Sequence, residues 1–279
     1  MNFIKNESLQ KLRGGYYTPP DLAAFLVRWV RGINPNSILE PSCGDGALFD
    51  AIGRVKGFRR LTVTGFEFND EEAAKARARA YEVGLKTVSV HAEDFLQWAL
   101  DHFDGKAQFD AVVGNPPFVR YQYLPAPFQV RAEQIFRQLE LPFTKHTNAW
   151  VPFILASMAL LRPGGRLAMV VPAEIMHVTH AQPLRSYLGR ESRRLVIVDP
   201  QEIWFKETLQ GAVLLLGEKR LDASDKAEGL AVYQVKGREF LDLDPEEVFA
   251  APRAIMAKPS KANGRAHCST TRPVRLSMS

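Results

Sequence analysis

The chain has 279 residues, of which 46% are hydrophobic and 24% are charged, and it contains two cysteines and a formal net charge of +5. These values are ordinary for a globular protein and exclude a disordered, collagen-like or disulfide-stapled chain. Because no apolar run is long enough to span a membrane and no export signal is found, we expect a cytoplasmic protein without membrane contacts.

The positive charge is concentrated at one end of the chain. Residues 251–279 contain six basic residues and no acidic one, so the preceding 250 residues are close to neutral. This stretch shows no apolar periodicity, which predicts a basic tail that is either flexible or truncated. Contact with phosphates is an alternative function for it. A neutral body predicts weak and salt-dependent attachment to any nucleic acid.

Apolar runs that end in turn residues alternate along the chain with helical patterns. Strands are predicted at 37–41, 61–67, 87–91, 109–115, 166–172, 194–199 and 211–217, and helices at 20–31, 47–55, 70–83 and 148–161. This order predicts an α/β fold, a doubly wound, Rossmann-like sheet of seven mostly parallel strands. We expect a lead at 1–14, one catalytic domain at 15–250 and the tail at 251–279, with ligands at the carboxyl ends of the strands.

The connection from Pro116 to Thr147 is unusually long for such a sheet and is rich in aromatic residues, arginine and proline. Connections between a strand and a helix are commonly about 2–6 residues long. Long excursions often line a substrate cleft, which is the prediction here. A helix over 127–139 that only covers the edge of the sheet is the alternative.

A glycine-rich loop follows the first strand and opens a helix. It includes Glu40, Pro41, Cys43, Gly44 and Gly46. The two glycines remove Cβ atoms where a ligand approaches the backbone, and the helix offers free N–H groups. The two carboxylates of this loop, Glu40 and Asp45, would repel a pyrophosphate but suit S-adenosylmethionine, which carries an ammonium and a sulfonium.

Phe49 occupies the position of the third glycine of the dinucleotide-binding fingerprint, which weighs against NAD. Glu67 ends the second strand, where an acid can accept hydrogen bonds from both ribose hydroxyls. Asp94 and Phe95 follow the third strand. They are placed to bond the adenine amine and to pack on its ring, although N-capping of a helix is an alternative role for Asp94.

Asn115, Pro116, Pro117 and Phe118 end the fourth strand. The Asn115 side chain and the Pro116 carbonyl can each accept a hydrogen from an exocyclic amine, which directs its lone pair at a methyl donor. The prolines fix the direction of that carbonyl. Phe118 can stack on a base flipped out of a duplex. Cytosine C5 methylation needs a cysteine nucleophile, and no cysteine is suitably placed.

These motifs, in this order, resemble the γ-type amino-methyltransferases of restriction-modification systems, which methylate adenine N6 in DNA. The resemblance covers roughly residues 15–217. It implies that Tyr17 and Thr18, in the segment Gly15–Pro20, contact the cofactor S-adenosylmethionine. Phe68, beside Glu67, and Asn115 are expected to contact it too. It also implies that Phe205 provides a second aromatic face for the target base. No metal is implied.

The resemblance implies a catalytic domain that acts on double-stranded DNA. Too few residues follow it for the target-recognition domain of that family, which predicts either a separate specificity subunit or a missing C-terminal domain. Three alternatives are kept. Methyltransferases that share this tetrapeptide act on guanine N2 in RNA or on protein glutamine, and a truncated chain can bind S-adenosylmethionine without transferring its methyl group.

Overall fold

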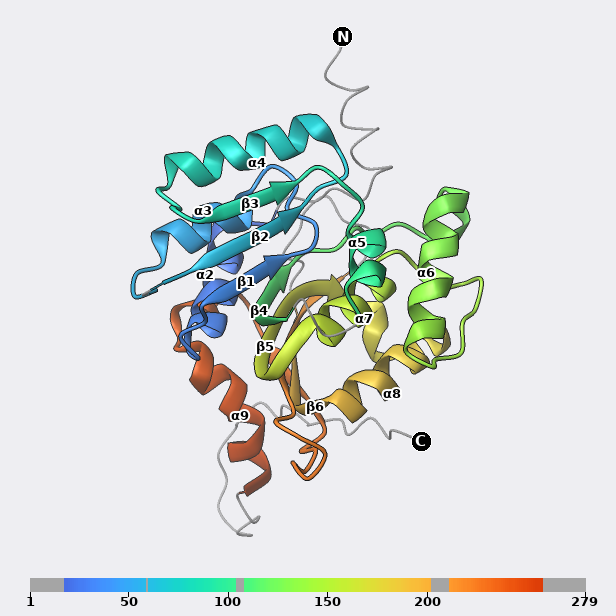
Figure 1. The fold of residues 1–279 in the computed structure, drawn as a ribbon. Coiled ribbons are helices and arrows are strands. Elements are labelled where there is room, and N and C mark those ends of the chain that lie inside the picture. The colour runs from blue at the N-terminus through green and yellow to red at the C-terminus, as the bar shows by residue number, and fades with distance from the viewer. Residues whose placement is uncertain (1–17, 59, 104–107, 202–210, 258–279) are drawn as a thin grey trace, which may run out of the picture.

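The computed structural model describes residues 18–58, 60–103, 108–201 and 211–257, which form alternating strands and helices (Figure 1). The strands are β1 Ser37–Glu40, β2 Thr62–Phe66, β3 Val88–His91, β4 Phe109–Gly114, β5 Leu161–Pro172, β6 Ser192–Pro200, β7 Ala212–Lys219 and β8 Leu230–Val235. The α-helices are α2 Pro20–Arg31, α3 Ala47–Arg54, α4 Asp70–Glu82, α5 Phe95–Asp101, α6 Ala126–Gln138, α7 Trp150–Leu160, α8 Gln182–Glu191 and α9 Pro245–Ala257. Short 3₁₀-helices are η1 Tyr121–Tyr123, η2 Ala173–Met176, η3 Thr179–Ala181 and η4 Glu239–Asp242.

The strands form one sheet in the order β3-β2-β1-β4-β5-β7-β6-β8. Strand β7 runs antiparallel to its neighbours β5 and β6, and every other pairing is parallel. The strand order reverses between β1 and β4, and this is where ligands bind in doubly wound sheets. The glycine loop after β1 and the tetrapeptide after β4 therefore leave the same edge of the sheet as neighbours. The predicted α/β, mostly parallel, doubly wound architecture is confirmed.

The predicted number of seven strands was wrong, because the described residues form a sheet of eight strands. Strand β8 pairs only with β6, at the edge of the sheet, and Val235 is its one buried residue. Its sequence, Leu-Ala-Val-Tyr-Gln-Val, is rich in strand-forming residues, so this strand could have been predicted from the sequence. The predictions also omitted α8 and α9.

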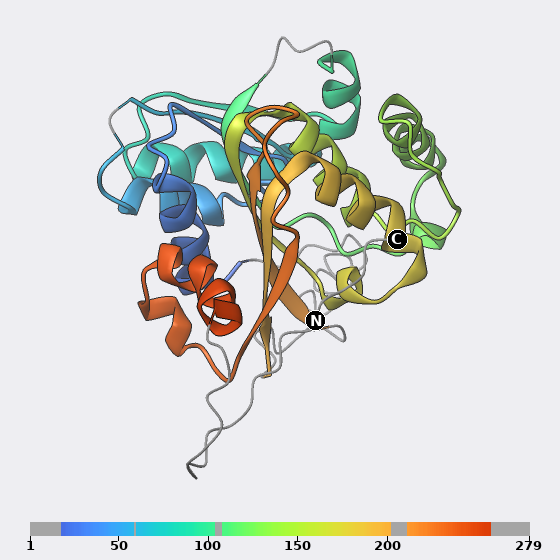
Figure 2. The ribbon, with the colours of Figure 1, turned by 90° about the horizontal axis from the view of Figure 1, so that it is seen from below.

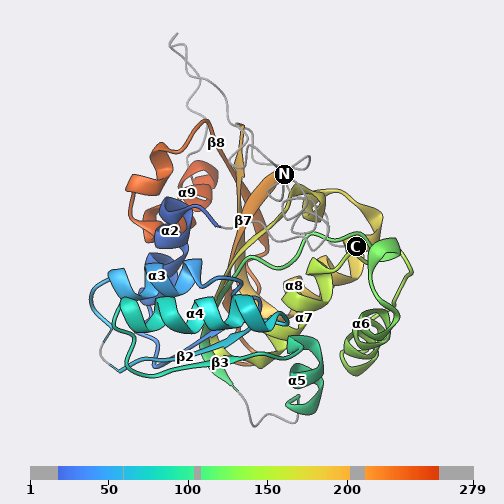
Figure 3. The same ribbon diagram turned by 90° about the horizontal axis from the view of Figure 1, so that it is seen from above.

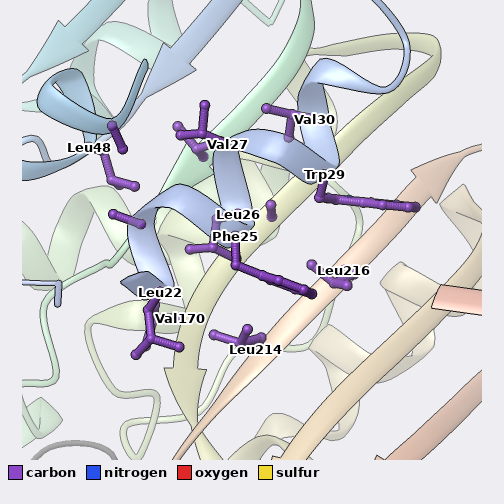
Figure 4. Close-up of a cluster of buried hydrophobic side chains, with 14 of the residues drawn as sticks. Leu22, Phe25, Leu26, Val27, Trp29, Val30, Leu48, Val170, Leu214 and Leu216 are labelled. Atoms are coloured by element: carbon purple, nitrogen blue, oxygen red, sulfur yellow. The ribbon is translucent and has the colours of Figure 1, made fainter. Parts of the chain in front are cut away.

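Two apolar layers cover the sheet. Successive strand residues point to opposite faces, as Ile38 and Leu39 of β1 do. Helices α2, α3, α4 and α9 pack on the Ile38 face, and α5, α6, α7 and α8 on the Leu39 face (Figures 2 and 3). Figure 4 shows α2 covering β5 and β7, with Phe25 directed toward Leu214 and Leu216.

Helix α9 crosses the domain boundary that was predicted at residue 250. Its Phe249 ring packs on Trp29 of α2 with ring centroids 4.2 Å apart, and it is 5% exposed. Glu246 of the same helix pairs with Arg166, which also donates 2.9 Å to Glu218 and 2.8 Å to the Trp29 carbonyl. A buried charge is tolerated only when it is paired and hydrogen-bonded, so these contacts make α9 part of the core on that face.

Candidate cofactor and target site

The glycine loop makes a tight turn whose backbone faces open space. Gly44 has φ +52°, and a Cβ at this position would have no atom within 4 Å. Gly46 has φ +88°, and a Cβ there would lie 3.0 Å from Cα of Ala76. Left-handed backbone and close approach favour glycine at both positions. The Cys43 N–H donates 2.8 Å to the carbonyl of Phe66, which anchors the turn to the end of β2.

Phe49, which replaces the third glycine of the dinucleotide fingerprint, has its own complementary glycine. A Cβ on Gly65 of β2 would lie 2.4 Å from Cζ of Phe49. The phenyl ring of α3, itself fully buried, therefore lies over the strand because Gly65 has no side chain. Helix α3 and the sheet approach each other closely here as well, with the small residue on the strand instead of on the helix.

Glu40 is the most deeply buried acid of the site. It is 2% exposed, and within the described part of the chain its Oε2 atom has no hydrogen-bond partner. Burial raises the pKa of its carboxyl well above the ordinary value, and the nearby Asp45 and Glu67 raise it further. An unpartnered buried carboxylate that faces a cleft is suited to a cationic ligand group.

Asp45 forms an ion pair with Arg79. Its Oδ2 atom lies 3.0 Å from a guanidinium nitrogen of Arg79, whereas its Oδ1 atom is buried without a partner among the described residues. Burial raises the pKa of the Asp45 carboxyl, and Arg79 opposes that shift. The loop therefore presents more negative than positive charge to the cleft.

Glu67 links the ends of two loops. Its carboxylate accepts hydrogen bonds from the N–H of Gly44 at 3.1 Å and of Asn69 at 2.8 Å. Burial raises its pKa, while these two hydrogen bonds oppose the shift. Phe68 beside it also lines the cleft and is 78% exposed. A large apolar side chain so exposed within a cleft is suited to contact with a planar ligand.

Asp94 caps the N-terminus of α5, which is the alternative role predicted for it from the sequence. Its Oδ1 atom accepts from the N–H groups of Leu96 at 2.8 Å and Gln97 at 3.2 Å. Its Oδ2 atom accepts from Arg131 of α6 at 3.1 Å, a contact that the sequence did not reveal. Contact of Asp94 with adenine stays a prediction. Phe95 is buried, with its ring centroid 5.5 Å from that of Phe153, a further cleft residue.

The tetrapeptide is tied to the glycine loop. The Ser42 hydroxyl donates 3.2 Å to the main-chain carbonyl of Asn115. Pro117 lines the same cleft as Asn115. Phe118 instead packs against the apolar clusters on both faces of the sheet and is not among the cleft-lining residues, and neither is Pro116. The role of Phe118 in stacking on a base stays a prediction.

One cleft of about 1020 Å³ collects most of the predicted residues. Those that line it are Thr18, Glu40, Pro41, Cys43, Gly44, Glu67, Phe68, Asp94, Phe95, Asn115 and Pro117. Gly46 lies behind the loop and starts α3. Tyr17 and Phe205 lie outside the described residues. Burial raises the pKa of the Cys43 thiol, which leaves it protonated and a poor nucleophile.

The long connection supplies the wall that faces the glycine loop. Tyr123, Leu124, Pro125, Pro127, Phe128 and Arg131 line the cleft. The connection therefore lines a cleft, as predicted, and the binding of substrate there stays a prediction. The helix that the alternative placed at 127–139 is also present, as α6. Residues of its first turns line the cleft, so this helix does more than cover the edge of the sheet. Figure 1 shows α6 outside α5 and α7.

Two kinds of feature are absent from the described part of the chain. No helix there has the length and apolar character needed to cross a lipid bilayer. No group of three or more histidine, cysteine, aspartate or glutamate side chains in the described ranges is arranged to hold a metal ion.

The sheet order and the glycine loop at its switch point define the fold of a class I S-adenosylmethionine-dependent methyltransferase. The chain belongs to the N-6 DNA methylase family, whose model matches residues 2–238. S-adenosylmethionine is its cofactor. The exposed glycine backbone and the unpartnered Glu40 carboxylate fit a ligand that carries a ribose and a positive charge.

Type II methyltransferase M.BanIII from Aneurinibacillus aneurinilyticus is 26% identical over 237 residues, which cover 76% of this chain and 40% of that protein. The chain therefore spans less than half the length of this relative. The methyltransferase subunit of a type I restriction-modification system from Streptococcus thermophilus has the same fold, with a TM-score of 0.63 at 16% identity, over 88% of this chain and 55% of that one. The DrdV–DNA complex matches with a TM-score of 0.64 at 12% identity, over 85% and 30%.

Proposed function

We propose that this chain is the catalytic domain of a DNA methyltransferase that methylates the N6 amine of an adenine flipped out of the duplex. One observation carries the proposal. Asn115 lines the same cleft as the glycine loop, and Ser42 of that loop is hydrogen-bonded to it. An amide side chain in the same cleft as the glycine loop can hold an amine opposite a methyl donor bound by that loop.

S-adenosylmethionine, when bound, supplies an electrophilic methyl group on a sulfonium. We assign Glu40 to the cationic amino-acid part of the cofactor and Glu67 to its ribose, with Phe68, Asp94 and Phe95 at its adenine. The Asn115 side chain and the Pro116 carbonyl accept the two amine hydrogens of the target, which keeps the nitrogen lone pair directed at the methyl group. The methyl carbon would exchange its bond to sulfur for a bond to the amine nitrogen, and the nitrogen would then lose one proton to solvent.

The test is methyl transfer to mixed genomic DNA at low salt with labelled S-adenosylmethionine, followed by mass spectrometry of the nucleosides. N6-methyladenine is the expected product. RNA and release factor are run beside the DNA. Label in RNA guanine or in protein glutamine would replace the proposal with that activity, and cofactor binding without transfer to any substrate would identify a silent binding module.

The matched residues cover 40% of the length of the relative M.BanIII. We propose that a separate specificity subunit or a C-terminal recognition domain supplies the base contacts, and that the protein acts in the cytoplasm. Addition of the partner is expected to raise activity at physiological salt, because a near-neutral body gains little from phosphate contacts.

Cofactor affinity is expected to fall as the pH drops from neutrality toward 4.5, the ordinary pKa of a glutamate. Burial raises the pKa of Glu40 in the cofactor-free protein, whereas a bound cation favours its ionised form, so binding releases protons. Calorimetry at several pH values, in buffers of different ionisation enthalpy, measures this release. Glu40→Gln should remove most of the pH dependence, and an affinity that rises as the pH falls would contradict the assignment.

The contribution of Glu40 to the stability of the cofactor-free protein is expected to change with pH in the opposite direction to cofactor affinity. A carboxyl whose pKa is raised on folding binds its proton more tightly in the folded state. Its contribution to stability is therefore present below pH 4.5, the ordinary value, and is lost as the pH rises through the raised pKa of Glu40. Denaturation of the wild-type protein and of Glu40→Gln across this range, without cofactor, separates the two effects.

A further inference from the structure

We infer that Asn148 and Glu174 are positioning residues, which together hold the segment that follows the catalytic tetrapeptide. The inference rests on the proposed function, because that function makes the tetrapeptide catalytic. The Asn148 Oδ1 atom accepts from the N–H of Tyr121 at 3.2 Å, and its Nδ2 atom donates to Oε2 of Glu174 at 3.0 Å. One amide group thereby connects the loop after β4 to the segment after β5.

The two ends of the tetrapeptide are both fixed. At its start, the carbonyl of Asn115 accepts from Ser42 at 3.2 Å. Just past its end, the carbonyl of Val119 accepts from the N–H of Ala149 at 2.9 Å. The bond between Tyr121 and Asn148 follows two residues later. Together these bonds hold the backbone on both sides of Pro116, whose carbonyl is assigned to the target amine.

The residues that hold this segment belong to a rigid part of the molecule. Ala149 is fully buried and Trp150 is 1% exposed, and almost every side chain of α7 behind them is buried. Glu174 is held in η2, where its carbonyl accepts from the N–H groups of His177 at 3.2 Å and Val178 at 3.0 Å. Close-packed interiors deform little, so the loop after β4 is attached to a fixed frame.

The role of Asn148 is separate from helix capping. Asparagine just before a helix usually accepts a hydrogen bond from the first turn. Helix α7 has no side-chain cap, and the side chain of Asn148 is directed to Tyr121 and Glu174 instead. A residue that only started α7 would not need these partners.

The chemistry of the pair requires an amide at position 148. The side chain accepts from a backbone N–H through one atom and donates to a carboxylate through another, and the two ends of an amide do this without charge. Aspartate keeps the acceptor but faces Glu174 with a second carboxylate, which is unfavourable at this distance. Exchange of the two groups restores the pair, because a glutamine at position 174 donates to an aspartate at position 148.

The test compares Asn148→Asp, Glu174→Gln and the double variant with the wild-type chain. Asn148→Asp is expected to lower kcat on genomic DNA by about 10- to 100-fold, since small misplacements of reacting groups can lower rates by about 100-fold. The Kd of S-adenosylmethionine should change less than about 2-fold, because no cofactor contact is assigned to either residue. Glu174→Gln alone should have a smaller effect, because glutamine still offers an acceptor, and the double variant should recover most of the lost rate.

A second measurement does not depend on turnover. Hydrogen exchange by mass spectrometry should show faster exchange in the peptide that contains Tyr121 for Asn148→Asp, and a return toward the wild-type rate for the double variant. Asn34→Asp is the matched control, because Asn34 is exposed, lies in the turn before β1 at the opposite edge of the sheet, and its replacement adds the same charge.

The outcomes separate the two proposals. A wild-type chain that methylates no DNA contradicts the proposed function, and the exchange measurement still decides whether the pair holds the loop. Unchanged exchange in Asn148→Asp, or a double variant no better than Asn148→Asp, overturns the inference. A loss of cofactor affinity equal to the loss of kcat also overturns it, because that result indicates general disruption of the cleft.

Discussion

Asn115→Ala is expected to reduce methyl transfer to DNA by about 100-fold or more, in the range found when one preorganised transition-state contact is removed. The cofactor Kd should stay within about 2-fold of the wild-type value, since the other cofactor residues come from separate loops. The physical reason is that the amine of a nucleobase is a weak nucleophile, because its lone pair is delocalised into the ring. The amide oxygen of Asn115 localises that lone pair by accepting one amine hydrogen.

Turnover on genomic DNA and calorimetry with S-adenosylmethionine measure the two quantities separately. Asn115→Asp is the matched variant, because it keeps an acceptor oxygen and should retain more activity than alanine. Loss of cofactor affinity in Asn115→Ala, with activity reduced only in proportion, would move this residue from the target to the cofactor.

Glu67→Ala is expected to raise the cofactor Kd by about 10- to 100-fold, since hydrogen bonds to a charged group contribute about 1.5–3 kcal/mol. Glu67 also holds the Gly44 and Asn69 N–H groups at 3.1 Å and 2.8 Å, so its loss affects the shape of both loops as well. Glu67→Gln keeps an acceptor for one of these groups and should show a smaller rise in Kd.

Calorimetry gives the Kd, and thermal denaturation without cofactor shows whether the fold is retained. Glu82→Ala is the control, because it removes the same charge from the exposed end of α4. A Kd for Glu67→Ala that equals that of the control would remove Glu67 from the cofactor site.

The cleft combines cofactor residues from the first half of the chain with a wall from the connection after β4. Arg131 of that wall donates 3.1 Å to Asp94, and Gln97 of α5 accepts from the same guanidinium at 3.2 Å. The part of the molecule that faces the target is thus bonded to the part assigned to the adenine of the cofactor. Binding of the cofactor is therefore expected to influence binding of the target, and binding of the target to influence binding of the cofactor.

The sequence by itself determined the sheet and the place of the site. Apolar runs that do not alternate predict parallel strands covered on both faces, and such strands carry their carboxyl ends to one edge. The loop at Gly44 and the motif at Asn115 follow neighbouring strands of this arrangement. Their meeting in one cleft could therefore be predicted without coordinates.

Only the tertiary structure decided which side chains are partners. Arg131 lies 37 residues from Asp94, and Ser42 lies 73 residues from Asn115, and no local pattern records such pairs. Strand β8 was missed although its residues are mostly apolar, whereas its place at the edge of the sheet beside β6 follows only from the tertiary structure. Local propensity and periodicity act over a few residues, whereas packing and hydrogen bonding between distant segments depend on the whole folded chain.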